Sequence, residues 1–158
     1  MTTTYTVQQF SELNLTGYAT TLPALSTTNA AAVSELKGQH FQTLGRSGKF
    51  SALLQGSRDH YGYALSTVTA TQLDYFAGAN TTVTDPAAVK RQVPAGAYVV
   101  MRAQGGYDRP LFDQLLSDFF TEILPQNPQL SVNRAFFLEI LRNGQPQNAE
   151  VEVRIPLN

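Results

Sequence analysis

One carboxylate interrupts an otherwise apolar run near the end of the sequence. In the segment RAFFLEIL, residues 134–141, Glu139 stands between Leu138 and Ile140. The segment is typical of a buried strand, and a buried carboxylate is unfavourable unless it is paired or hydrogen-bonded. Glu139 can therefore pair with a neighbouring side chain or anchor a cation or donor group of a ligand. As a third interpretation, it acts as a general acid or base with a raised pKa.

A neighbouring partner is available if this segment pairs with the last strand of the sequence. The loop NGQPQN predicts a turn that makes residues 134–142 and 149–157 an antiparallel hairpin. In one register Glu139 lies opposite Arg154 and forms an ion pair with it. A shift of one residue places Val153 opposite and leaves the acid on an apolar face. The loop permits both registers.

Other residue types offer little further chemistry. The sequence has no cysteine, which excludes disulfides and thiolate sites. His40 and His60 are separated and lack a cluster of carboxylates, which is a poor pattern for a metal site. The segment GRSGK, residues 45–49, lacks the spacing of a phosphate-binding loop. We therefore predict no cofactor, no metal and no catalytic residue, and a binding function is favoured over an enzymatic one.

The composition is that of an ordinary globular domain. The chain has 158 residues, of which 42% are hydrophobic and 15% charged, and its formal net charge is −1. No basic stripe is present, so direct nucleic-acid binding through phosphate contacts is not expected. The sequence begins without the pattern of a signal peptide, and no apolar run is long enough to cross a bilayer. We expect a soluble, cytoplasmic protein that makes no membrane contact.

The first half of the chain predicts a strand, a helix and a hairpin. Residues 13–23 have the composition of a strand. Residues 26–45 carry apolar side chains at helical spacing. Residues 49–57 and 61–70 are predicted as two strands joined by a short turn, and residues 71–92 as a long connection.

The second half repeats this order. Its strand, helix, strand and strand are predicted at residues 93–106, 109–125, 134–142 and 149–157. A repeated unit indicates two modules, of about residues 1–78 and 90–158, packed about a pseudo-two-fold axis. We therefore predict a single α+β domain over residues 1–158, built from two pseudo-symmetric strand–helix–strand–strand modules.

Four segments of this pattern carry a resemblance to a known family. They are VPAGAYVV at residues 93–100, Ile123-Leu124-Pro125 at the helix end, Leu138-Glu139-Ile140, and the last strand with Glu150, Glu152 and Pro156. In this order they resemble the gyrase-inhibitor-like small-molecule-binding domain, also called the AraC-type effector-binding domain. The resemblance covers nearly the whole chain.

The resemblance implies a ligand groove between the antiparallel sheets of the two modules, with Glu139 as its polar anchor. The other candidate ligand-binding residues are Phe137, Leu141, Arg154, Tyr63 and Glu152. The expected function is that of a stand-alone domain that binds an organic ligand, cationic or aromatic, as in multidrug-sensing transcription regulators. The alternatives are a hydrolase of reactive DNA-alkylating electrophiles that uses Glu139, and a protein-binding inhibitory or regulatory module.

Arg154 departs from the family pattern, which often has an aromatic residue at this position. Its side chain shares a strand face with Glu150 and Glu152. If Glu139 lies on that face too, the guanidinium partly neutralises the carboxylate. An anionic or neutral polar ligand would then be favoured over a cation.

Overall fold

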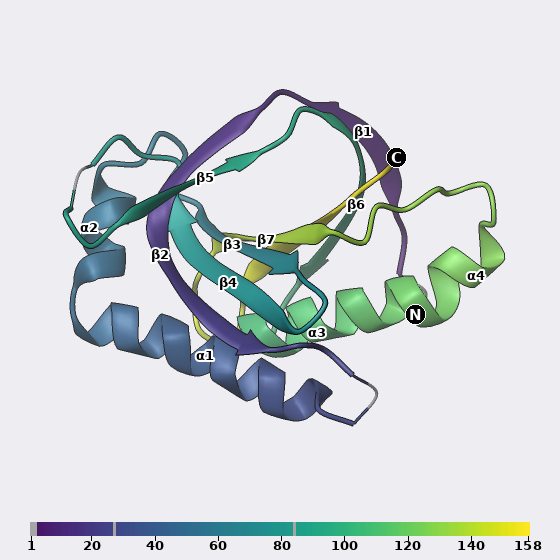
Figure 1. Ribbon diagram of the computed structural model, residues 1–158, viewed down its shortest axis with the longest axis horizontal. Helices are drawn as coiled ribbons and strands as arrows, with labels where there is room; N and C mark the ends of the chain where they lie inside the picture. Colours follow the sequence, from purple (N-terminus) through teal and green to yellow (C-terminus); the bar gives the residue numbers. More distant parts are fainter. Residues whose placement is uncertain (1–2, 27, 84) are drawn as a thin grey trace.

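The computed structural model describes residues 3–26, 28–83 and 85–158, and the first two residues of the predicted first module lie outside these ranges. The described residues form one antiparallel sheet in the order β1-β6-β8-β7-β3-β4-β2-β5. The strands are β1 (Thr6–Phe10), β2 (Leu13–Pro23), β3 (Gly62–Val68), β4 (Gln72–Ala79), β5 (Val89–Val93), β6 (Gly96–Gln104), β7 (Phe136–Asn143) and β8 (Glu150–Pro156). Figure 1 shows that the sheet curls strongly, so that it has one concave and one convex face.

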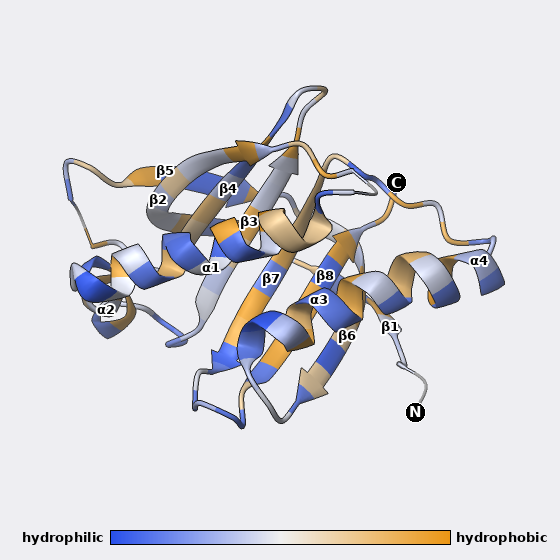
Figure 2. Ribbon diagram, turned by 90° about the horizontal axis from the view of Figure 1, so that it is seen from below, coloured by the Kyte–Doolittle hydropathy of each residue, from blue (hydrophilic) through white to orange (hydrophobic). Residues whose placement is uncertain are grey.

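Helices cover one face of this sheet. They are α1 (Ala30–Arg46), α2 (Lys49–Gln55), α3 (Asp108–Asp118), a π-helical turn (Phe119–Ile123) and α4 (Leu124–Gln126). Figure 2 shows α1 and α3 lying across the sheet on the same side. Within the described ranges, no helix combines the length and apolar character that crossing a membrane requires.

The α+β class and the two-module repeat are confirmed. One module consists of β2, α1, β3 and β4, and the other of β6, α3, β7 and β8. The modules join edge to edge, because β3 pairs with β7 from Gly62–Leu141 to Thr67–Phe136. The strands of both modules therefore form one continuous sheet, and the space between the modules lies between their helices.

The backbones of β2 and β4 approach each other closely at one pair of glycines. Gly17 of β2 pairs with Gly78 of β4 and also with Val89 of β5. A Cβ atom at Gly17 would lie 2.1 Å from the carbonyl oxygen of Ala77, and one at Gly78 would lie 2.4 Å from that of Thr16. Only glycine fits where two backbones approach this closely.

The strand predicted at residues 49–57 is wrong, because this segment forms the helix α2. Its apolar residues Phe50, Leu53 and Leu54 lie at helical spacing and pack in a cluster that also contains Leu44. Gly48, with φ of 75°, separates α2 from α1 by a left-handed residue. The short run of apolar residues therefore folds back onto α1 instead of entering the sheet.

The hairpin of the first module consequently lies further along the chain than predicted. It is formed by β3 and β4, and the segment predicted as a connection supplies both β4 and β5. Most of β4 is buried, including the consecutive residues Tyr75, Phe76 and Ala77. A strand buried on both faces lacks the polar–apolar alternation by which strands are recognised.

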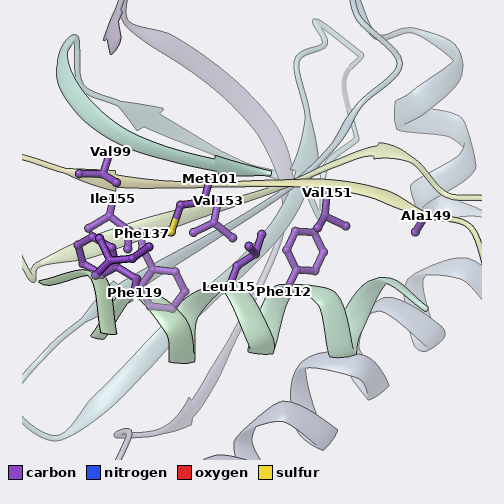
Figure 3. Packing of buried hydrophobic residues seen from close by; sticks show 11 residues of the cluster. Val99, Met101, Phe112, Leu115, Phe119, Phe137, Ala149, Val151, Val153 and Ile155 are labelled. Carbon is purple, nitrogen blue, oxygen red and sulfur yellow. The ribbon is translucent and has the colours of Figure 1, made fainter. Parts of the chain in front are cut away.

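Separate apolar cores occupy the two faces of the sheet. On the helix-covered face, Phe112, Leu115 and Phe119 point towards Met101 and Val153, as Figure 3 shows. Burying one such side chain contributes about 1.5–3 kcal/mol. The concave face has its own cluster of buried side chains: Leu15, Tyr63, Leu65, Phe76, Val93, Tyr98, Val100, Leu138 and Ile140. The concave face is therefore filled by the protein's own side chains.

Candidate functional site

Two cavities lie between α1 and α3, over the sheet face that both helices cover. We call the first the Tyr75 compartment. It has a volume of about 340 Å³, and its lining includes Gly38, Phe41, Tyr75, Arg109, Phe112 and Glu139. We call the second the Phe120 compartment. It has a volume of about 770 Å³, and its lining includes Val33, Lys37, Asp113, Leu116, Phe120 and Phe137. The two compartments together are the α1–α3 groove.

Glu139 lies at the base of this groove and is fully buried, with 0% of its side chain exposed. It sits opposite Ala64 of β3 and Val153 of β8. Both carboxylate oxygens accept hydrogen bonds from the Arg109 guanidinium: Nη1 lies 3.3 Å from Oε1, and Nη2 donates to Oε2. The Lys37 ammonium lies 3.9 Å from Oε1. The partner of the buried acid is thus a pair of cations from the two helices.

These cations decide the protonation state of Glu139. Burial alone would raise the pKa of its carboxyl group, but the charges of Arg109 and Lys37 hold that pKa below its ordinary value. The carboxylate is therefore ionised at neutral pH. The interpretation of Glu139 as a general acid or base with a raised pKa finds no support in this environment.

A chain of polar contacts extends from Glu139 across the groove. The Arg109 Nε atom donates to Asp113, one helical turn further along α3, at 3.0 Å. The other carboxylate oxygen of Asp113 accepts a hydrogen bond from the Ser34 hydroxyl of α1 at 2.6 Å. These contacts orient Arg109 over Glu139 and connect the two helices.

Lys37 is buried, although lysine rarely is. It lies on the apolar stripe of α1 between Val33 and Leu44, and only 3% of the residue is exposed. Its ammonium lies 5.0 Å from the ring centroid of Phe137 and 5.4 Å from that of Tyr75. Burial lowers the pKa of the Lys37 amine, against the opposing effect of Glu139. Lys37 is thus held at the groove at the expense of its hydration, with Glu139 as its counter-charge at 3.9 Å.

Tyr75 brings an unsatisfied hydroxyl group to the same place. The residue is 0% exposed, and its hydroxyl makes no hydrogen bond of good geometry to any described residue, although the Arg109 guanidinium lies close enough to oppose the rise in its pKa. Burial, followed by the charge of Glu139, raises the pKa of this phenol well above its ordinary value. Tyr75 therefore keeps its proton and remains a hydrogen-bond donor inside the compartment.

The predicted site residues fall on both faces of the sheet. Phe137 and Leu141 share the face of Glu139, and they line the Phe120 and Tyr75 compartments respectively. The open question of register is answered by the pairing of Glu139 with Val153. Arg154 consequently points to the opposite face and forms no ion pair with Glu139.

Tyr63, Glu152 and Arg154 lie on the concave side, and each has partners there. The Tyr63 hydroxyl donates to Asp59 at 2.5 Å. Glu152 accepts hydrogen bonds from Arg102 at 2.7 Å and from Arg154 at 2.6 Å. These contacts account for the three residues within the fold, away from the α1–α3 groove.

Sequence reasoning did not identify three residues of the groove: Lys37, Tyr75 and Arg109. Lys37 could have been identified from the sequence, because it lies four residues after Val33 and therefore on the apolar stripe of α1. A lysine on that stripe is as unusual as a glutamate in the strand of Glu139. Arg109 has the sequence context of an ordinary first helical turn. Its contact with Glu139 joins residues that are distant in the chain, which no local pattern predicts.

Comparison with known proteins places this architecture among effector-binding proteins. A profile of the family described as "Integron-associated effector binding protein" matches residues 8–157. A search of curated proteins finds no match. The structure of SAV2435 bound to tetraphenylphosphonium is similar with a TM-score of 0.80 at 16% identity, covering 98% of this chain and 94% of that one.

Other solved structures share the fold as well. An integron cassette protein from Vibrio cholerae has a TM-score of 0.69 at 16% identity, covering 99% of this chain and 98% of the other. The C-terminal domain of EcmrR has a TM-score of 0.60 at 11% identity, covering 100% and 99% of the two chains. At these identities the similarity establishes the fold.

Proposed function

Because the chain belongs to the family of integron-associated effector-binding proteins, we propose that it binds a small organic molecule in the α1–α3 groove. The membership agrees with the resemblance to an effector-binding domain that the sequence motifs carry. The observation that supports this location is a buried cluster of polar groups, Glu139, Arg109, Lys37 and Tyr75, gathered at cavities between the two helices.

The dimensions and lining of the groove suit a small organic ligand. Sites for such molecules have volumes of about 300–1,000 Å³ and combine apolar walls with a few placed polar groups. The Tyr75 and Phe120 compartments, of about 340 and 770 Å³, fall within this range. Their walls include the rings of Phe41, Phe112, Phe120 and Phe137. An aromatic molecule can pack against these rings.

Family membership alone does not determine the charge of the ligand, so we infer it from the groove of this chain. SAV2435 has been solved with the cation tetraphenylphosphonium. In the present chain, a cation that approached Glu139 would have to displace Arg109, which already hydrogen-bonds both carboxylate oxygens. We therefore propose an aromatic ligand without a positive charge. An aromatic cation is the competing alternative. The Glu139 environment gives the hydrolase alternative no support, because an ion-paired carboxylate is a weak base.

A cavity-filling variant tests the proposal. A Cβ atom at Gly38 meets no heavy atom within 4 Å, so Gly38→Leu extends a side chain into the Tyr75 compartment without a backbone clash. Gly45→Leu is the matched control, because Gly45 lies about two helical turns further along α1, away from the groove, and is equally unobstructed. Both changes favour the helix by about 0.5–1 kcal/mol.

The measurement is a thermal-shift screen of aromatic anions, neutral aromatics and planar cations on the wild type and both variants. A ligand that binds only the folded state raises the melting temperature by mass action. We expect compounds whose shift is lost in Gly38→Leu and retained in Gly45→Leu. If every stabilising compound acts equally on all three proteins, the ligand does not bind in the Tyr75 compartment and the proposal is wrong.

A further inference from the structure

The buried charges of the groove do not balance. Lys37 and Arg109 contribute two positive charges, with side-chain exposures of 4% and 19%, and Glu139 contributes one negative charge at 0% exposure. Asp113 also pairs with Arg109 at 2.9 Å and partly offsets these charges, but 42% of its side chain is exposed, so it stands at the edge of the groove. Among the mostly buried side chains of the groove, positive charges therefore outnumber negative ones, and we call this difference the surplus positive charge.

The negative groups that could offset this surplus stand at the edge of the groove. Asp108 is exposed, and its carboxylate accepts a hydrogen bond from the backbone N–H of Arg109. Asp113 is already bonded to Ser34 and to Arg109. Apart from Glu139 itself, the deeper positions thus belong to Lys37, Arg109 and Tyr75, all of which are donors.

Tyr75 provides the second observation. Its hydroxyl is buried in the lining of the Tyr75 compartment, and it has no hydrogen-bond acceptor among the described residues. A buried donor without an acceptor is unfavourable, because the hydrogen bond that it made to water is not replaced. Arg109 lines the same compartment and, as a guanidinium, can only donate. An acceptor group placed in this compartment would satisfy Tyr75 and lie close to the surplus positive charge.

We propose that the ligand of the groove is an aromatic carboxylate, whose head group accepts hydrogen bonds from the Tyr75 hydroxyl and the Arg109 guanidinium. Lys37 acts as a specificity residue that supplies the surplus charge, and Glu139 holds Arg109 in position. The aromatic body packs against the phenyl rings of the groove. This inference rests on the proposed function, which it deepens by naming the chemistry of the ligand.

Three compounds with one ring system separate the possible head groups. They are 2-naphthoate, 2-naphthamide and 2-naphthylmethylammonium, which carry a carboxylate, a neutral amide and a cation. Dissociation constants are measured by isothermal titration calorimetry at pH 7. We expect wild-type protein to bind 2-naphthoate about ten- to a hundredfold more tightly than 2-naphthamide, because hydrogen bonds to charged groups are the stronger ones. The ammonium compound should bind most weakly.

Two variants that preserve folding test the assigned residues. Tyr75→Phe removes only the unsatisfied hydroxyl, and we expect it to weaken 2-naphthoate binding about ten- to a hundredfold. Tyr18→Phe is its control, because the Tyr18 hydroxyl is bonded to Asp85 at 2.5 Å, away from the groove. Lys37→Met removes the surplus charge, so it should weaken binding of 2-naphthoate more than binding of 2-naphthamide.

The outcomes separate this inference from the proposed function. If the ammonium compound binds most tightly and Gly38→Leu abolishes its binding, the carboxylate inference is wrong. The groove would still be the binding site. Binding that is unaffected by Gly38→Leu would overturn both. Failure of 2-naphthoate to bind the wild type, or equal binding to wild type and Tyr75→Phe, would also overturn the inference.

Discussion

Replacing Glu139 by glutamine should destabilise the protein strongly. The change removes one charge and nearly preserves the shape of the side chain. It leaves the Lys37 ammonium and the Arg109 guanidinium, with side-chain exposures of 4% and 19%, without their buried counter-charge. Removing one partner of a buried ion pair typically costs about 3–5 kcal/mol, because the remaining charge is not compensated. Here two cations lose the same partner, so we expect a loss within that range.

This loss is measurable because the variant should remain folded in water. Domains of this size have unfolding free energies of about 5–15 kcal/mol. With a urea dependence of about 1–3 kcal/mol/M, a loss of about 3–5 kcal/mol should lower the midpoint of unfolding by about 1–5 M. The assay is urea denaturation at pH 7, followed by circular dichroism.

Glu150→Gln on the neighbouring strand β8 is the matched control for Glu139→Gln. Glu150 is partly exposed and takes part in none of the ion pairs of the described residues, so we expect a change within about 0.5 kcal/mol. Adding Lys37→Met to Glu139→Gln removes one of the two uncompensated cations, and the double variant should recover part of the loss. Equal midpoints for Glu139→Gln and Glu150→Gln would refute the buried ion-pair cluster.

Two further predictions concern the ion-pair cluster, and a third concerns the turn between α1 and α2. The pKa of Glu139 is held below its ordinary value of 4.5. Its contribution to stability is therefore complete above pH 4.5 and is lost as the pH falls through the folded-state pKa. When unfolding is measured at decreasing pH, wild type should lose stability more steeply than Glu139→Gln. The pKa of Lys37 is lowered from 10.5, so wild type gains stability as the pH rises towards 10.5. In urea denaturation, Lys37→Met should lack this gain, and at pH 7 its stability should equal or exceed that of wild type. Gly48→Ala places a side chain at a φ of 75° between α1 and α2, and should lower the free energy of unfolding by about 1–2 kcal/mol, whereas Gly45→Ala within α1 should not lower it.

The two-module architecture could be predicted because its signals are local and occur twice. The helix of the second module has clear apolar spacing, and its last two strands flank a loop with strong turn residues. The first module was harder, because β4 is buried on both faces and because the apolar residues of α2 form too short a run to distinguish helix from strand.

Part of the candidate site could also be predicted. Glu139 stood out because a carboxylate within an apolar strand requires a partner, and Phe137 and Leu141 follow from the alternation of the same strand. The partner itself could not be predicted, because Arg109 and Lys37 reach Glu139 from separate helices through tertiary packing. The face on which Arg154 lies depended on a one-residue choice of register that the loop left open.

The most direct test of the central claim is a crystal structure of the protein with the compound that gives the largest thermal shift. We predict that the ligand lies between α1 and α3, over Glu139 and in contact with Tyr75 and Arg109. A ligand bound on the concave face beside Tyr63 and Arg154, with the α1–α3 groove empty, would contradict the account.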